Sequence, residues 1–340
     1  MTTKIDAFPH ILPRRYFDRL EAGGGRRSHM LGRMRGTPVL YDFEQRLRIM
    51  DDHEGYVQVL TLAAPPIEEV ADPAESPELA HLANDEMAAL TDRYPDRFPG
   101  FVASLPMNNP EAALREIERA VGTLHATGIQ MYSNVAGRPL DRPEFQPLFD
   151  RMAELDLPIW IHPTRPATVA DYPDEPRSKY DIWWTFGWPY ETSAAMARLV
   201  FSGLFERHPE LKIITHHCGA MIPFCEGRIG SGLDALGTRG GDPGDAAAKE
   251  RLKRRPADYF RLFYGDTVLF GATAGLECGV AFFGSERVLF GTDMPFPDGG
   301  PGCVRDTIAS VERMRVSDEE RRLIYEGNAR RLLRLRALPG

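Results

Sequence analysis

Short runs of hydrophobic residues recur along the whole chain and alternate with stretches in which hydrophobic residues repeat every three or four positions. Runs of four to six residues that are rich in β-branched and aromatic types are typical of buried strands. Eight such runs are present, at residues 5–8, 57–62, 100–104, 129–133, 158–162, 212–217, 262–266 and 288–293.

The stretches between these runs favour helices. Residues 110–125, 144–155 and 193–207 carry hydrophobic stripes with the period of an α-helix. Strands that alternate with helices along a chain pair in parallel, and closing eight of them on one another gives a (β/α)8 barrel. The alternative is an open, doubly wound sheet. It is disfavoured because no glycine-rich phosphate-binding motif follows any predicted strand.

We expect one domain over residues 1–340, since no linker or internal repeat divides the chain. Three long segments depart from the strand–helix alternation, at about residues 11–56, 164–190 and 230–256. Long segments inserted in a compact domain are commonly lids or binding loops. We therefore expect all three at the face of the barrel where the strands end.

Composition narrows the function classes. The formal net charge is -8, which gives no basic face for the phosphates of a nucleic acid. The four cysteines lack the spacing of a metal site or a disulfide framework, as in proteins of a reducing compartment. No apolar run is long enough to span a bilayer, and the N-terminus lacks the pattern of a targeting peptide. We expect a cytoplasmic protein without nucleic-acid or membrane partners.

Side chains that bind metals or move protons stand where four predicted strands end. These are His10, His162, the pair His216 and His217, and Asp293. Each alone is explained by a structural hydrogen bond or a helix cap. Together, at the face where barrels of this kind build active sites, they predict a site for a divalent ion such as zinc or manganese.

The chain also resembles the amidohydrolase superfamily, in particular the branch of aminocarboxymuconate semialdehyde decarboxylase and γ-resorcylate decarboxylase. The resemblance covers nearly the full length. It is carried by KIDAFPHILP, IWIHPTRP, GWPYETSAAMARLVFSGLFERHPELKIITHHCGAMIPFCEGRI, YFRLFYGDT, VLFGTDMPF and SDEERRLIYEGNARRLL. It implies a distorted (β/α)8 barrel that holds one metal ion.

The resemblance also implies roles for individual residues. His10 matches the second ligand of a strand-one pair, and His162 and Asp293 match further ligands. His217 matches the strand-six histidine that acts as acid, base or substrate contact beside the metal, with Asp293 as its partner in catalysis. Arg228 matches a recurrent arginine of the branch, and we assign it to substrate binding.

Phe8 stands where the branch has the first ligand of the strand-one pair, and a phenyl ring has no lone pair to donate. Two interpretations follow. In the first, His10, His162 and Asp293 keep the metal, and water or substrate oxygens complete its shell beside Phe8, which we then assign to substrate binding. In the second, the metal is lost and the same side chains form a hydrogen-bonded cluster. Asp6, deeper on the same strand, is a further candidate for the missing ligand.

The resemblance favours a metal-dependent, non-oxidative decarboxylase of a small aromatic or unsaturated carboxylic acid. The same residues would serve a hydrolase of amides, esters or lactones, because a metal also activates water. A retired barrel that only binds is the third alternative, and it predicts that other catalytic positions are degraded as well.

Aromatic residues in the second long segment fit a flat substrate. Trp183, Trp184 and Trp188 lie together in the segment after strand five, and stacking on rings buries large apolar areas. Packing on the barrel exterior or in a subunit interface is the other interpretation. Arg165 follows His162 and is suited to bind a carboxylate in two places, unless it lies at the surface. The resemblance implies a homodimer or homotetramer.

Overall fold

A computed structural model describes residues 2–22, 29–238, 240 and 242–335. The glycine-rich part of the first predicted insertion, residues 23–28, lies outside the described residues, as do residues 239 and 241 of the third.

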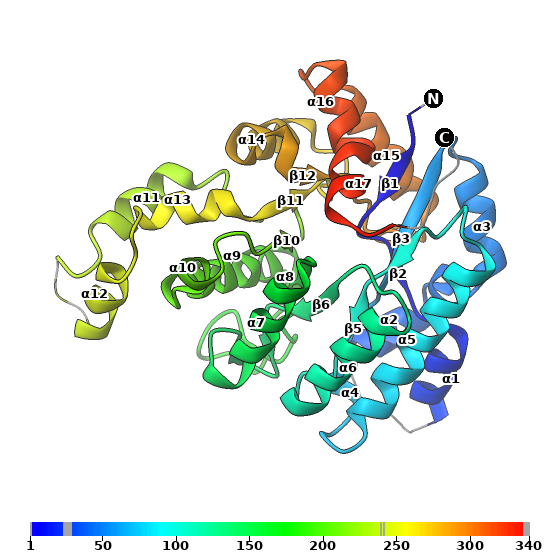
Figure 1. Ribbon diagram of the computed structural model, residues 1–340, viewed down its shortest axis with the longest axis horizontal. Helices are drawn as coiled ribbons and strands as arrows, with labels where there is room; N and C mark the ends of the chain where they lie inside the picture. Colours follow the sequence, from blue (N-terminus) through cyan, green and yellow to red (C-terminus); the bar gives the residue numbers. More distant parts are fainter. Residues whose placement is uncertain (1, 23–28, 239, 241, 336–340) are drawn as a thin grey trace.

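Eight parallel strand positions follow one another along the described chain, and two of them are split (Figure 1). Strand one is interrupted at residues 7–9 and strand three at Val102. The strands are β1 (Lys4–Asp6) with β2 (His10–Ile11), β3 (Tyr56–Leu62), β4 (Gly100–Phe101) with β5 (Ala103–Ser104), β6 (Ile129–Tyr132), β9 (Ile159–His162), β10 (Ile213–Thr215), β11 (Tyr264–Asp266) and β12 (Val288–Leu289).

The pairing of these strands closes a barrel. β1, β2 and β4 pair with β3, while β5, β6 and β9 to β12 form one sheet in the order β12-β11-β10-β9-β6-β5. Val102 N–H donates to Leu60 O at 2.8 Å and joins the two sheets on one side. On the other side Ala7 N–H donates to Phe290 O at 2.8 Å and Asp293 N–H to Phe8 O at 3.1 Å. The predicted (β/α)8 barrel is confirmed, and the open sheet is wrong.

Several strands are shorter than predicted. The region predicted as 262–266 begins in a 3-10 turn, η3 (Phe260–Leu262), so only Tyr264–Asp266 pair as a strand. Beyond β12, residues 290–293 continue along β1 and β2 without regular ladder pairing, because Gly291 N–H and Thr292 N–H donate to the side chains of Thr267 and Asp6 and the backbone turns at Asp293 (φ 61°).

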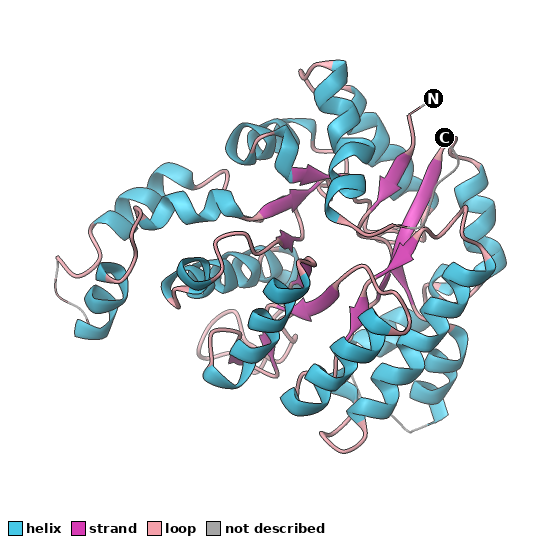
Figure 2. Ribbon diagram, viewed as in Figure 1, coloured by secondary structure: helices cyan, strands magenta, loops and turns pink. Residues whose placement is uncertain are grey.

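Helices surround the barrel (Figure 2). In chain order they are α4 (Ile67–Val70), α5 (Ser76–Arg93), α6 (Pro110–Gly122), η2 (Pro143–Phe145), α7 (Gln146–Leu155), α9 (Gly187–Phe201), α10 (Leu204–Arg207), α11 (Glu226–Asp234), α13 (Pro256–Tyr259), α14 (Thr273–Phe283), η4 (Ser285–Arg287), α15 (Pro301–Glu312), α16 (Asp318–Arg322), the π-helix η5 (Leu323–Gly327) and α17 (Asn328–Leu332). None of the helices in the described ranges combines the length and apolar character that crossing a bilayer requires.

The predicted helix 193–207 differs from the structure. α9 begins six residues earlier, at Gly187, and ends at Phe201. Gly203 then takes a left-handed conformation (φ 73°) that breaks the helix before α10. The helix predicted at 110–125 is present as α6, which Asn109 caps by accepting from Ala112 N–H at 3.1 Å.

The three predicted insertions carry their own elements. The first contains α1 (Arg14–Ala22), α2 (His29–Arg35), η1 (Pro38–Leu40) and α3 (Phe43–Asp51); the second contains α8 (Ile182–Thr185); and the third contains α12 (Pro243–Glu250). A hairpin of β7 (Asn134–Val135) and β8 (Arg138–Pro139) follows β6. Figure 1 shows α11, α12 and α13 projecting from the barrel.

Two hydrophobic clusters fill the molecule. The larger one joins the outer faces of the strands to the helices. The smaller one contains Ile5, Val59, Trp160, Ile214 and Leu289, which come from five different strands and therefore meet inside the barrel. Its side chains are fully buried, so the barrel is a packed core and only its mouth is open to ligands.

Candidate metal centre and its cavity

Four buried side chains converge at the mouth of the barrel. His10 stands on β2, His162 ends β9, His216 follows β10 and Asp293 lies four residues beyond β12. Each offers one ligand atom, and these atoms all lie within 4.8 Å of one another. Side chains that are up to 283 residues apart in the sequence, from His10 to Asp293, therefore share one small volume.

The distances within this cluster match a metal site. His10 Nε2 lies 2.9 Å and His216 Nε2 3.2 Å from Asp293 Oδ1. His10 Nε2 is buried and makes no hydrogen bond of suitable geometry. Donor atoms of a tetrahedral zinc site stand roughly 3 to 4 Å apart, since each is about 2.0–2.2 Å from the ion. The donor set and the orphaned nitrogen therefore fit a divalent cation.

Neighbouring groups fix the three imidazoles. Thr61 Oγ1 donates to Pro9 O at 2.6 Å and so accepts from His10 Nδ1 at 3.0 Å. His162 Nδ1 donates to Pro163 O at 2.7 Å. The Nδ1 atoms are therefore the protonated ones, and the Nε2 lone pairs are free for a metal, which is the usual arrangement around ligating histidines.

Asp266 fixes the third imidazole. His216 Nδ1 donates to Asp266 Oδ2 at 2.6 Å. Cys218 N–H donates to Asp266 Oδ1 at 2.9 Å. Val268 N–H donates to the same oxygen at 3.0 Å, so both oxygens of this buried carboxylate are used.

The charges favour a cation at this position. Burial would raise the pKa of Asp293, but the imidazoles of His10 and His216 hold it below its ordinary value. Burial lowers the pKa of His10 and takes that of His162 well below its ordinary value, so both are neutral ligands. Burial also opposes protonation of His216, but Asp266 and Asp293 raise its pKa to about 9, so a metal ion bound by this imidazole takes the place of a proton.

Phe8 packs beneath the cluster. Its ring stacks on the His216 imidazole, with 3.9 Å between centroids and 24° between planes. It is fully buried and does not line the cavity above the cluster. The structure therefore does not bring Phe8 to the substrate-binding position that the sequence suggested.

A cavity of about 160 Å³ opens above the four side chains. His10, His162, His217 and Asp293 line it on the barrel side. Its other walls come from α2, the loops and α8–α9, and they include Met30, Arg33, Met34, Trp183, Trp184, Trp188, Phe270 and Phe296. The structure thus brings the three predicted tryptophans to the cavity, rather than to the barrel exterior.

His217 lies beside the cluster but outside it. Its Nδ1 has no hydrogen-bond partner, and burial lowers its pKa to about 3. The backbone at His217 is left-handed (φ 56°), and it remains so through Cys218, Gly219 and Ala220. This turn separates His217, at the cavity wall, from His216 in the cluster.

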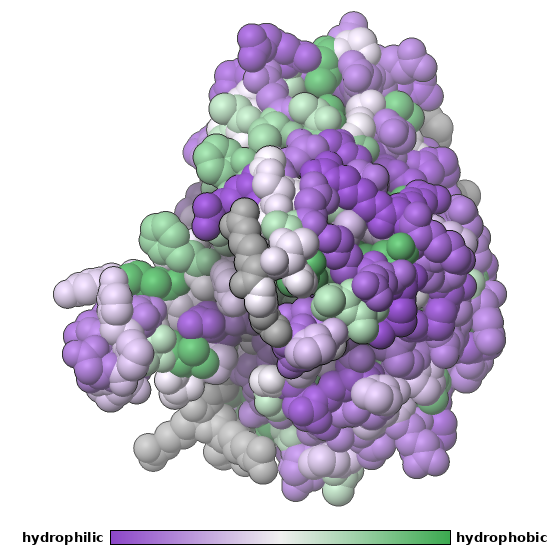
Figure 3. All heavy atoms as spheres, turned by 90° about the vertical axis from the view of Figure 1, so that its left-hand side faces the viewer, coloured by the Kyte–Doolittle hydropathy of each residue, from purple (hydrophilic) through white to green (hydrophobic). Residues whose placement is uncertain are grey.

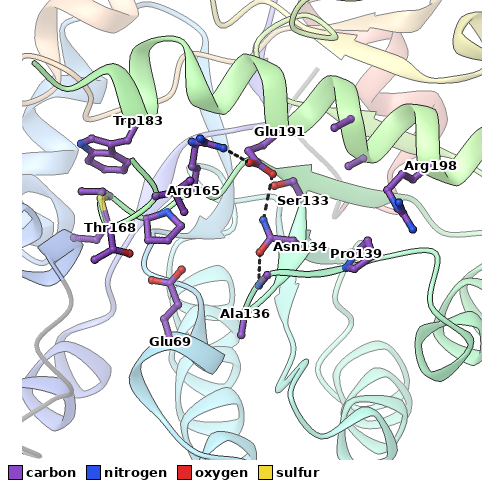
Figure 4. A pocket seen from close by; sticks show the side chains of 17 residues that line it. Glu69, Ser133, Asn134, Ala136, Pro139, Arg165, Thr168, Trp183, Glu191 and Arg198 are labelled. Carbon is purple, nitrogen blue, oxygen red and sulfur yellow. Dashed lines mark hydrogen bonds and ion pairs between the residues drawn. The ribbon is translucent and has the colours of Figure 1, made fainter. Parts of the chain in front are cut away.

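Arg165 faces a second cavity of about 690 Å³ (Figure 4). Its guanidinium pairs with Glu191 at 3.0 Å, and Glu191 also accepts from Asn134 at 3.4 Å. Trp183 lines both cavities. Arg165 is therefore neighbour to the metal centre's cavity without lining it.

Arg228 lies on α11, and its side chain is exposed. It does not line the cavity above the cluster, so the described chain does not place it at the site on its own.

Sequence reasoning missed the roles of three residues of this site. His216 was named with His217 at the end of strand six, but the resemblance gave a role only to His217. Asp266 ends a predicted strand, and this position was a usable signal. Arg33 lies in a segment without any strand or motif, so no signal in the sequence pointed to it.

The chain is similar in sequence to known proteins over most of its length. The model of the amidohydrolase family matches residues 10–335. A γ-resorcylate decarboxylase of Polaromonas sp. is 33% identical over 306 residues, which are 86% of this chain and 87% of the relative. A 2-amino-3-carboxymuconate-6-semialdehyde decarboxylase of Dictyostelium discoideum is 31% identical, over 87% of this chain and 77% of the relative.

Among solved structures, a dihydroxybenzoic acid decarboxylase of Polaromonas sp. superposes with a TM-score of 0.78 at 29% identity. The match covers 98% of this chain and 97% of that one, whose structure contains bound manganese and the inhibitor 2-nitroresorcinol.

Proposed function

Because this chain belongs to the amidohydrolase family, we propose that it is a metal-dependent, non-oxidative carboxy-lyase for a small aromatic or unsaturated carboxylic acid. The observation that carries the proposal is the cluster of buried donors at the floor of a cavity walled by aromatic side chains. The decarboxylase relatives at 31–33% identity support the reaction type.

In this proposal His10, His162 and Asp293 hold one divalent metal, manganese or zinc. Bound there, the metal supplies a Lewis acid that polarises an oxygen of the substrate next to the reacting carbon. Manganese in the Polaromonas structure supports this choice. The orientation of the imidazoles by Thr61 and Pro163 keeps their lone pairs toward the cation.

The substrate is held by the cavity walls. Trp183, Trp184 and Trp188 offer flat apolar surfaces for an unsaturated ring or chain. Arg33 is the cation among the described residues that line this cavity, and it is suited to pair with a carboxylate or a ring hydroxyl. Arg165 lines only the adjoining cavity, where it pairs with Glu191 at 3.0 Å.

Decarboxylation needs one proton. The bond between the ring or chain carbon and the carboxylate breaks, its electron pair stays on that carbon, CO₂ leaves and a proton takes its place. His217 and Asp293 face the cavity and are positioned to pass this proton to the carbon. Burial disfavours the charged imidazole of His217, so it releases a proton readily, and its Nδ1 has no other hydrogen-bond partner.

The test is turnover of a panel of hydroxybenzoic acids and muconate-type acids by the manganese- or zinc-loaded protein, with CO₂ release as the measurement. We expect release from at least one acid, and a loss of about 10²- to 10⁴-fold in kcat for His217→Asn. Hydrolysis of lactones, esters or amides without CO₂ would instead establish the hydrolase alternative. No turnover of either kind by the metal-loaded protein would contradict the proposal.

We also propose a homodimer or homotetramer, as in the family resemblance. Large hydrophobic side chains exposed near α8, α9 and α11, such as Phe186 (72%), Tyr190 (58%) and Phe224 (87%), support it. Figure 3 shows the face that bears α11 and α12, where hydrophobic atoms interrupt the hydrophilic surface. A cytoplasmic location is likewise a proposal, supported by four free cysteines.

A further inference from the structure

We propose that His216 is a fourth protein ligand of the metal and takes the place that Phe8 leaves empty on strand one. This inference rests on the proposed function, because it concerns the same metal centre. It differs from the three-ligand set of His10, His162 and Asp293 by adding a donor from strand six.

The position of His216 supports the proposal. Its Nε2 lies 3.2 Å from Asp293 Oδ1, close to the 2.9 Å of the His10 nitrogen from the same oxygen. Its ring centroid lies 5.0 Å from that of His162 and 5.8 Å from that of His10. A cation held by the other three donors is therefore within reach of His216 as well.

The orientation of His216 is also that of a ligand. Its Nδ1 donates to Asp266 Oδ2 at 2.6 Å, so the proton stands on the nitrogen away from the cluster. A carboxylate behind a ligating histidine is a common arrangement in metal sites, where it sets the tautomer and strengthens the donor. Asp266 is therefore a positioning residue in this proposal.

Phe8 occupies the strand-one position of the missing donor and packs against His216. The phenyl ring lies against the His216 imidazole, at 3.9 Å between centroids, in the space beneath the cluster. A Cβ at position 291 would stand 3.3 Å from the β-carbons of both Phe8 and Asp266, so glycine at 291 leaves room for their close approach. Phe8, His216 and Asp266 thus form one packed unit.

The backbone separates the two adjacent histidines. The backbone is left-handed at His217 (φ 56°), Cys218 (φ 54°) and Ala220 (φ 57°), a conformation that residues other than glycine rarely adopt. This turn lets His216 face the cluster while His217 lines the cavity. The two residues therefore have different tasks, ligand and proton carrier.

The experiment compares metal binding by the full chain and its variants. Metal-free protein is titrated with Co²⁺ against a chromophoric chelator, and the visible absorption of bound Co²⁺ reports the donors. We expect His216→Asn to bind Co²⁺ at least tenfold more weakly, with an altered spectrum. Asp266→Asn should weaken binding about 10- to 100-fold.

His217→Asn is the matched control. It changes the adjacent histidine in the same way, and we expect it to keep the Co²⁺ affinity and spectrum of the wild type. Circular dichroism of each metal-free variant establishes that it is folded.

A rescue variant distinguishes the loss of a ligand from a loss of folded protein. Adding Phe8→His to His216→Asn returns a donor to strand one, and we expect it to recover most of the lost affinity. In the wild-type background Phe8→His should bind more tightly, but by a smaller factor.

Two results separate this inference from the proposed function. If His216→Asn binds Co²⁺ with wild-type affinity and spectrum while CO₂ release persists in the wild type, His216 is not a ligand and the carboxy-lyase proposal stands. If affinity falls as expected but no acid releases CO₂, the ligand set stands and the proposed reaction is wrong. A wild-type chain that binds no Co²⁺ overturns the inference.

Discussion

At the scale of the residue, a buried acid with an unsatisfied oxygen stands on α4. Glu68 is buried, and its Oε1 has no hydrogen-bond partner. Burial, with a smaller contribution from the charge of Glu69, raises its pKa from the ordinary 4.5 to about 8, against the opposing effects of a backbone hydrogen bond and of Arg138. Burial raises the pKa of the Tyr16 and Tyr132 hydroxyls, and a negative charge on Glu68 raises both further. The folded protein therefore favours the neutral form of Glu68.

This pKa predicts a pH dependence of stability. The folded state keeps a proton that the unfolded chain releases above about pH 4.5, so stability from this group is complete below that pH and falls as the pH rises to about 8. Glu68→Gln removes the titration. We expect its melting temperature to rise relative to the wild type between about pH 5 and pH 9, measured by calorimetry. If the difference in melting temperature between Glu68→Gln and the wild type stays the same across this pH range, the raised pKa of Glu68 is wrong.

At the scale of the element, two short helices from separate insertions meet over the cavity. Arg33 of α2 lies 5.7 Å from the ring centroid of Trp183 and 5.5 Å from that of Trp184, both on α8. Its Nη1 pairs with Asp181 at 3.1 Å. One guanidinium therefore joins the helices and lines the cavity.

This junction predicts a role in substrate binding. Arg33→Met should raise KM for the carboxylate substrate about 10- to 100-fold, because a hydrogen bond to a charged group is lost, while kcat changes less. Steady-state kinetics on the substrate found in the panel measures both constants. The control is Arg35→Met on the same helix, whose partner is Glu21 at 2.8 Å. Equal KM values for the two variants would refute the role.

The elements themselves were largely predictable. Strand–helix alternation gives the order of the barrel because each buried run must pair with the next. The break of α9 at Gly203 and the short β11 were not, since left-handed turns and 3-10 pieces leave weak patterns. His10, His162 and Asp293 follow from strand ends. The choice between His216 and His217 does not, because the backbone turn decides it.

At the scale of the whole molecule, the four donors come from four strand positions: β2, β9, β10 and the segment after β12. A metal there connects opposite parts of the barrel without help from any helix. Binding to the folded state alone stabilises it, by about 2.7 kcal/mol when the free metal exceeds its Kd 100-fold.

This connection predicts that metal removal lowers thermal stability. Treatment with a chelator should lower the melting temperature of the wild type by several degrees, and added Mn²⁺ or Zn²⁺ should restore it. His162→Ala removes one donor and should lose most of this response. Scanning calorimetry with and without metal makes the comparison. A variant that responds as strongly as the wild type would contradict the assignment of His162.

The seam that closes the barrel has a consequence for biosynthesis. Asp293 N–H donates to Phe8 O, and His10 N–H donates to Met294 O at 2.6 Å, so the first and last strands meet where the donors stand. In a chain emerging from the ribosome, the three histidine donors are present long before Asp293, the carboxylate donor, is translated. The complete set of four donors exists only after residue 293 has been translated, and a nascent fragment that stops before Asp293 has no complete site to trap the ion prematurely.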